Sequence, residues 1–148
     1  MRFSIVTDTF PPEINGVAMT LRRLAEGLAS AGHAVEVVRP KPAGHDGRVG
    51  KGGDPGRFLE RQVSGIPLPG YTGLRLGLPQ KRRLVKRWTD NRPDAIYVAT
   101  EGLLGHSAVA AADSLAINAV SGYHTHFAQY MEHYRLHLFE RLALRYLR

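Results

Sequence analysis

The start of the chain places one helix pattern between two strand patterns, and this order limits the fold more than any other feature. Phe3–Thr7 is a short, continuous apolar run, which is typical of a strand buried on both faces of a parallel sheet, and Ala34–Val38 predicts a second strand. Between these runs, apolar residues recur at helical spacing, at Val17, Leu21, Leu24, Ala25 and Leu28. A strand, a helix and a strand in close succession predict a right-handed crossover between parallel strands.

The same alternation continues along the chain, interrupted by the glycine-rich segment Lys41–Arg57, which predicts a loop, and by the turn-rich segment Ile66–Pro79. The other expected elements are a weak strand over Phe58–Val63, a helix over Pro79–Asn91, a strand over Ala95–Ala99, a helix over Leu103–Ala116, a strand over Ala119–Tyr123 and a helix from Phe127 to the end. Together they predict an α/β fold, with a doubly wound, Rossmann-like parallel sheet and helices on both faces.

Length and composition bound the class of protein. The 148 residues fit one domain, and the absence of cysteine excludes disulfides and thiolate–metal sites. No apolar signal segment or bilayer-spanning stretch occurs, and we expect a cytoplasmic location, either free or peripheral at the inner face of the membrane. The last expected helix is apolar nearly all round and needs cover on more than one side. We therefore expect a truncated domain over residues 1–148, with dimerisation as the alternative cover.

The net charge of +7 suits binding to a nucleic acid, an anionic membrane surface or a phosphorylated small molecule. Alternatively, it reflects a domain separated from an acidic half of a longer protein. The expected helix Pro79–Asn91 combines basic residues with the apolar stripe of Leu84, Val85 and Trp88. Its candidate membrane or anion patch consists of Lys81, Arg82, Arg83, Lys86, Arg87 and Trp88. Such a helix can lie in a membrane interface, or it can be the solvated outer face of a helix packed through that stripe. No nucleic-acid motif accompanies the charge, so we expect no nucleic-acid partner.

The first loop, Asp8–Val17, follows a strand of the expected sheet, where doubly wound folds bind ligands. It carries neither the dinucleotide fingerprint nor the phosphate-loop motif. Asn15 and Gly16 stand directly before the helix pattern. Glycine lets a ligand approach the backbone, and the N–H groups of a helix N-terminus favour phosphate. An ordinary turn and helix cap is the alternative interpretation of this pair.

A second candidate site is the histidine segment Ser121–Phe127, at the end of the last expected strand. His124 and His126, with His133 and His137 one helical turn apart, make a histidine metal site conceivable. No carboxylate or further ligand has metal-motif spacing, and a polar contact to a substrate is the better interpretation. We expect no metal.

Four segments together resemble glycosyltransferase family 4, the retaining enzymes with two Rossmann-like domains (the GT-B fold). They are RFSIVTDTFPPEINGVAMTLRRLAEGLASAGHAVEVVRP, PLPGYTGLRLGLP, PDAIYVATEGLLGHSA and SGYHTHFAQY. The subgroup resembled includes lipid mannosyltransferases and sulfoquinovosyl transferases. The resemblance implies that this chain is the N-terminal, acceptor-side domain, and that a C-terminal nucleotide-sugar domain is absent.

The resemblance also implies roles for single residues. Gly16, with Asn15, would hold the diphosphate of a sugar nucleotide such as GDP-mannose or a UDP-sugar, and His124 would contact the transferred sugar near the reacting centre. Acceptor contacts are expected from Thr9, Tyr71, Thr125 and His126. The expected function is transfer of a hexose, such as mannose, to a lipid or glycan acceptor, with the isolated chain inactive. The alternative is a non-enzymatic basic module that binds an anionic membrane surface.

Overall fold

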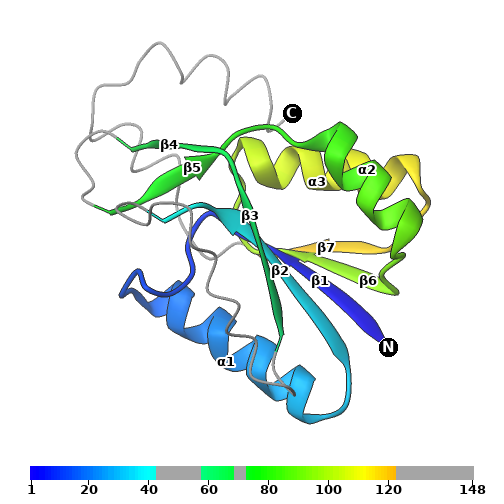
Figure 1. Ribbon diagram of the computed structural model, residues 1–148, viewed down its shortest axis with the longest axis horizontal. Helices are drawn as coiled ribbons and strands as arrows, with labels where there is room; N and C mark the ends of the chain where they lie inside the picture. The colour runs from blue at the N-terminus through cyan, green and yellow to red at the C-terminus, as the bar shows by residue number, and fades with distance from the viewer. Residues whose placement is uncertain (43–57, 69–72, 123–148) are drawn as a thin grey trace.

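The computed structural model describes residues 1–42, 58–68 and 73–122. Within these ranges, one parallel sheet has the strand order β3-β2-β1-β6-β7. Its strands are β1 (Arg2–Val6), β2 (Ala34–Pro40), β3 (Leu59–Val63), β6 (Ala95–Val98) and β7 (Ala119–Ser121). The helices are α1 (Gly16–Ser30), α2 (Lys81–Asp90) and α3 (Leu103–Ser114), with α1 on one face of the sheet and α2 and α3 on the other (Figure 1). The predicted doubly wound α/β fold is confirmed.

The chain reverses its direction across the sheet at β1. It moves from β1 to β2 and β3 on one side, then returns to β6 and β7 on the other. Val6, the last residue of β1, pairs with Val38 of β2 and Val98 of β6. The loops that follow β1 and β6 therefore start side by side. In open α/β sheets this switch point, at the carboxyl ends of the strands, is where ligands bind.

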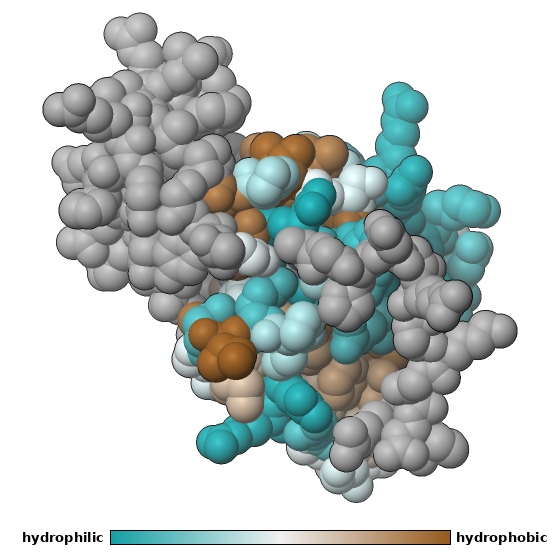
Figure 2. Space-filling model, turned by 60° about the vertical axis from the view of Figure 1, so that its left-hand side comes forward, coloured by the Kyte–Doolittle hydropathy of each residue, from teal (hydrophilic) through white to brown (hydrophobic). Residues whose placement is uncertain are grey.

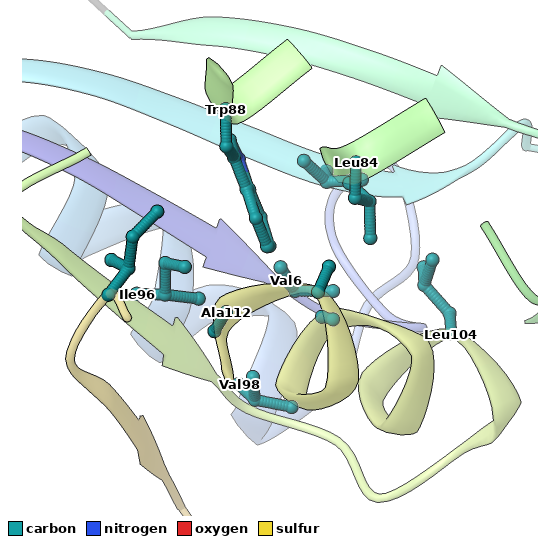
Figure 3. Close-up of a cluster of buried hydrophobic side chains, with 11 residues drawn as sticks. Val6, Leu84, Trp88, Ile96, Val98, Leu104 and Ala112 are labelled. Atoms are coloured by element: carbon teal, nitrogen blue, oxygen red, sulfur yellow. The ribbon is translucent and has the colours of Figure 1, made fainter. Parts of the chain in front are cut away.

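The two faces of the sheet bury separate hydrophobic clusters, because successive strand residues point to opposite faces. The cluster under α2 and α3 includes Val6, Leu84, Trp88, Ile96, Val98, Leu104 and Ala112 (Figure 3). The cluster under α1 consists of Ile5, Phe10, Leu21, Ala25, Val35, Val37 and Ala99. The apolar residues of β1 thus serve both faces at once, as the sequence predicted, and those of β2 do the same.

The turn that ends α1 explains a glycine in the sequence. Gly32 has a φ of +84°, the left-handed conformation that glycine adopts without steric cost. Its N–H donates to the carbonyl of Ala29 at 3.0 Å, and the N–H of His33 donates to the carbonyl of Leu28 at 3.1 Å. These bonds satisfy carbonyls of the last turn, so that the chain turns directly into β2.

The turn-rich segment Ile66–Pro79 differs from the prediction. It contributes to a small antiparallel pair, β4 (Gly65–Pro67) with β5 (Arg75–Gly77). Strands of three residues are too short to show a period in the sequence. Residues 43–57 of the predicted glycine-rich loop, the end of the strand predicted over Ala119–Tyr123 and the helix predicted from Phe127 lie outside the described residues.

Candidate functional site

The loop between β1 and α1 is closed by a chain of hydrogen bonds. Asn15 caps α1, because its Oδ1 accepts the backbone N–H of Ala18 at 2.8 Å. Its Nδ2 donates to Oγ1 of Thr9 at 2.7 Å, and the Thr9 hydroxyl donates to Oε2 of Glu13 at 3.4 Å. The first turn of α1 is therefore tied back to the start of the loop.

A buried arginine fastens the middle of this loop. Arg39, near the end of β2, is 1% exposed, and its Nη2 donates to Oε1 of Glu13 at 2.8 Å. Arg39 also donates to the carbonyl of Pro11, and Oε2 of Glu13 accepts the backbone N–H of Phe10 at 2.7 Å. Burial lowers the pKa of Arg39, while the negative charges of Glu13 and Glu60 act in the opposite direction. The buried pair of Arg39 and Glu13 thus holds the loop to the sheet.

A hollow of about 300 Å³ lies at the N-terminus of α1, lined by Gly16, Val17, Thr20 and Leu21. Gly16 is the first residue of the helix, and a Cβ built there would have no atom within 4 Å. The first N–H groups of a helix have no partner inside the helix, and the helix dipole adds partial positive charge at this end. This hollow can therefore accept a negatively charged group close to the backbone.

Asp8, the second residue after β1, joins the loop to two other segments. Its Oδ1 accepts the backbone N–H of Gly77 at 2.7 Å, and its Oδ2 accepts the hydroxyl of Thr100 at 2.9 Å. The side chain is buried, and burial raises its pKa from 3.8 to about 6, against the opposing hydrogen bonds from Gly77 and Thr100. The negative charge of Glu13 raises it further.

The sign of the resulting pH dependence follows from the raised pKa. Between pH 3.8 and about 6, the folded state keeps a proton on Asp8 that the unfolded state has lost. The contribution of Asp8 to stability therefore falls as pH rises through this window and is constant above it. At neutral pH the ionised group costs the folded state on the order of 3 kcal/mol, relative to an unperturbed aspartate.

The structure brings three of the predicted site residues together. Asn15 and Gly16 form the start of α1, and Thr9 bonds to Asn15. Thr9 is 7% exposed and its hydroxyl bonds within the loop, so its expected contact with an acceptor stays a prediction. The other residues expected to contact the sugar or acceptor lie outside the described residues: Tyr71, His124, Thr125 and His126.

The predicted basic patch on α2 needs a correction. Trp88 is 1% exposed and belongs to the hydrophobic cluster under α2, so it cannot enter a membrane interface (Figure 3). Arg87 is half-buried, and its Nε donates to Oε2 of Glu36 on β2 at 2.5 Å. The exposed cations of the patch are Lys81, Arg82, Arg83 and Lys86. The apolar stripe thus packs on the sheet, as the alternative interpretation held.

Exposed hydrophobic side chains can be located on one face of the molecule in Figure 2. On the face shown in Figure 2, they gather in separate patches between hydrophilic side chains. Ile14, in the loop after β1, is 93% exposed. Within the described ranges, no helix is long and apolar enough to cross a bilayer.

The sequence interpretation missed the residues that hold the loop. Asp8 and Arg39 each lie at the carboxyl end of an apolar strand pattern, and a charge in that place is the signal that could have identified them. Among the described residues, no group of three histidine or acidic side chains could hold a metal ion. The histidines considered for a metal lie outside this part of the chain.

Comparison with known proteins decides the family. Residues 14–148 match the sequence model of Glycosyltransferase Family 4. The chain belongs to this family. The fold also resembles MurG from Acinetobacter baumannii, with a TM-score of 0.52 and 17% identity over 81% of this chain and 33% of that one. At this identity the likeness concerns the fold alone.

Curated relatives with sequences similar to this family 4 chain are named as sugar-transferring enzymes. It is 33% identical to a GDP-mannose-dependent alpha-mannosyltransferase of Mycolicibacterium smegmatis, over 97% of this chain and 37% of the relative. It is 30% identical to an alpha-monoglucosyldiacylglycerol synthase of Acholeplasma laidlawii, over 97% of this chain and 34% of the relative. The family 4 chain therefore spans little more than a third of the length of these relatives.

Proposed function

We propose that this chain is the N-terminal, acceptor-side domain of a retaining glycosyltransferase, which moves a hexose from a sugar nucleotide to a lipid or glycan acceptor. Membership of family 4 supports the reaction class. The names of the relatives support GDP-mannose as donor and a glycerolipid as one kind of acceptor. Mannose is the hexose that we favour.

Gly16 carries this proposal. Nothing in the described packing requires glycine at this position, since a Cβ there would meet no atom within 4 Å. At Gly77, Gly102 and Gly105, by contrast, a Cβ would lie 2.7, 2.3 and 2.1 Å from the nearest atom. Glycine at position 16 would let a ligand approach the helix start closely, and a diphosphate suits the N–H groups and dipole there.

Catalysis requires more than this domain supplies. In transfer from a sugar nucleotide, the leaving diphosphate gains negative charge, and stabilising that charge is a large part of catalysis. The hollow at Gly16 offers backbone N–H groups on one side of the diphosphate. A second, C-terminal domain would supply the remaining cations and close over the donor. We therefore expect no transfer by the isolated chain, and no metal is required.

A second role is favoured by the exposed face of α2. Lys81, Arg82 and Arg83 follow one another at its start and are all exposed. With Trp88 buried, this face would hold an anionic membrane surface by charge alone, so that binding weakens as salt rises. This role suits a lipid acceptor and a peripheral location at the inner face of the membrane.

The test is a two-dimensional NMR map of the labelled 148-residue chain with GDP-mannose, and with mannose alone as control. We expect the largest amide shifts at Gly16, Val17 and Ala18, and none of that size with mannose. Shifts that are largest on α2 instead would contradict the proposed donor site and favour a basic binding module.

A further inference from the structure

One buried carboxylate links the segments that surround the switch point of the sheet. Asp8 lies after β1 and bonds to Gly77, at the end of β5, and to Thr100, after β6. Its backbone N–H also donates to Oγ1 of Thr100 at 2.8 Å. Asp8 is 5% exposed, and both carboxylate oxygens have a donor. The side chain thus acts on neighbouring segments and does not offer a free base.

The glycines around Asp8 show that the surrounding backbone is built to admit its carboxylate. A Cβ at Gly102 would lie 2.3 Å from Oδ2 of Asp8, and a Cβ at Gly77 would lie 3.1 Å from Oδ1. Gly102 is the residue before α3, so the carboxylate lies close to the start of that helix. A larger residue at Gly102 would displace the carboxylate from Thr100.

Asp8 is also connected to the start of α1. Thr9, its neighbour in the chain, accepts a hydrogen bond from Asn15 at 2.7 Å, and Asn15 caps the first turn of α1 through Ala18. A shift of Asp8 would therefore be transmitted through Thr9 and Asn15 to Gly16. The path consists of adjacent residues and two hydrogen bonds, which the side chains of Thr9 and Asn15 make.

We propose that Asp8 is a positioning residue for the donor site, whose ionised carboxylate fixes the place of Gly16 relative to the start of α3 and the end of β5. This inference rests on the proposed role of Gly16 in donor binding. Asp8 touches neither donor nor acceptor in this scheme. It keeps the loop in place while the loop binds the diphosphate.

Keeping the Asp8 carboxylate ionised lowers the stability of the fold, which argues that its charge has a functional role. Burial raises the pKa of Asp8, so an asparagine with the same shape would fold at neutral pH without that penalty. The titratable and charged groups on the segments around it include Glu13 in the same loop, Arg75 on β5, Glu101 before α3 and His106 on α3. A functional site that retains a destabilising charge is a recurrent pattern.

The test follows amide shifts of the whole chain against pH, without any sugar nucleotide, in wild type and Asp8→Asn. In wild type we expect the amides of Gly77, Gly16 and Ala18 to shift with one midpoint near pH 6, the midpoint of the Asp8 carboxyl carbon. In Asp8→Asn all three shifts are expected to disappear. Any shift that persists in this variant belongs to another titrating group, such as a histidine.

Two results would overturn the proposal. If Gly77 follows the Asp8 carboxyl while Gly16 and Ala18 do not, Asp8 is a local clamp without influence on the donor loop. If Gly16 titrates unchanged in Asp8→Asn, another group positions the loop. Should the variant fail to fold, the wild-type midpoints alone still show whether Gly16 and Ala18 follow the Asp8 carboxyl. GDP-mannose binding is measured separately, so a failure of the proposed donor site is distinguishable from a failure of Asp8 positioning.

Discussion

Replacing Trp88 by alanine is expected to lower the free energy of unfolding by about 3–5 kcal/mol. The side chain is 1% exposed and lies among Val6, Leu84 and Ile96, between α2 and the sheet (Figure 3). Removing it leaves a cavity that rigid neighbours on β1 and β6 cannot fill. Urea unfolding followed by far-UV circular dichroism measures the change.

Trp88→Phe is the matched control. The indole N–H of Trp88 has no hydrogen-bond partner among the described residues, so phenylalanine loses volume but no hydrogen bond. We expect it to cost less than half as much as alanine. An alanine variant as stable as wild type would mean that Trp88 is exposed, which would restore it to a membrane-facing patch.

Replacing Gly105 by alanine is expected to destabilise the protein by about 3 kcal/mol, at the upper end of the usual cost of overpacking. A Cβ at this position would lie 2.1 Å from the backbone oxygen of Thr100 and 3.0 Å from Cγ1 of Val98. Because one obstacle is backbone, α3 itself would have to move away from β6. Thermal and urea unfolding both report the loss.

Gly27→Ala is the matched control for Gly105→Ala, and it is expected to stabilise the protein. Gly27 lies within α1, and a Cβ there would meet no atom within 4 Å. Alanine is favoured over glycine in helices, so this variant should gain up to about 1 kcal/mol. If Gly105→Ala were as stable as Gly27→Ala, α3 would not pack closely against the loop after β6.

The fold could be predicted because its signals are local. β1 and β2 are each rich in apolar and β-branched residues, and α1 repeats apolar residues at helical spacing, so each pattern identifies its own element. The order of these elements then requires a parallel sheet. β4 and β5 escaped prediction because three residues carry no period, and their pairing depends on contacts between distant positions.

The site could be predicted only in part, for the same reason. Asn15 and Gly16 are neighbours, so a cap and a ligand-accessible helix start were visible in the sequence. The partners of Asp8 lie 69 and 92 residues further along the chain, and no local pattern connects them. For Trp88 the local pattern was visible but ambiguous. An apolar stripe on a basic helix has the same sequence pattern whether it packs on a sheet or on a membrane.

The most direct test of the donor site is the affinity of GDP-mannose for wild type, Gly16→Ala and Gly27→Ala. Gly16→Ala is expected to unfold at the wild-type temperature, since its Cβ enters open space. It should nevertheless bind GDP-mannose at least about tenfold more weakly, a loss of about 1.4 kcal/mol, while Gly27→Ala binds as wild type does. Equal affinities of Gly16→Ala and wild type would contradict the account, because the diphosphate would then lie elsewhere.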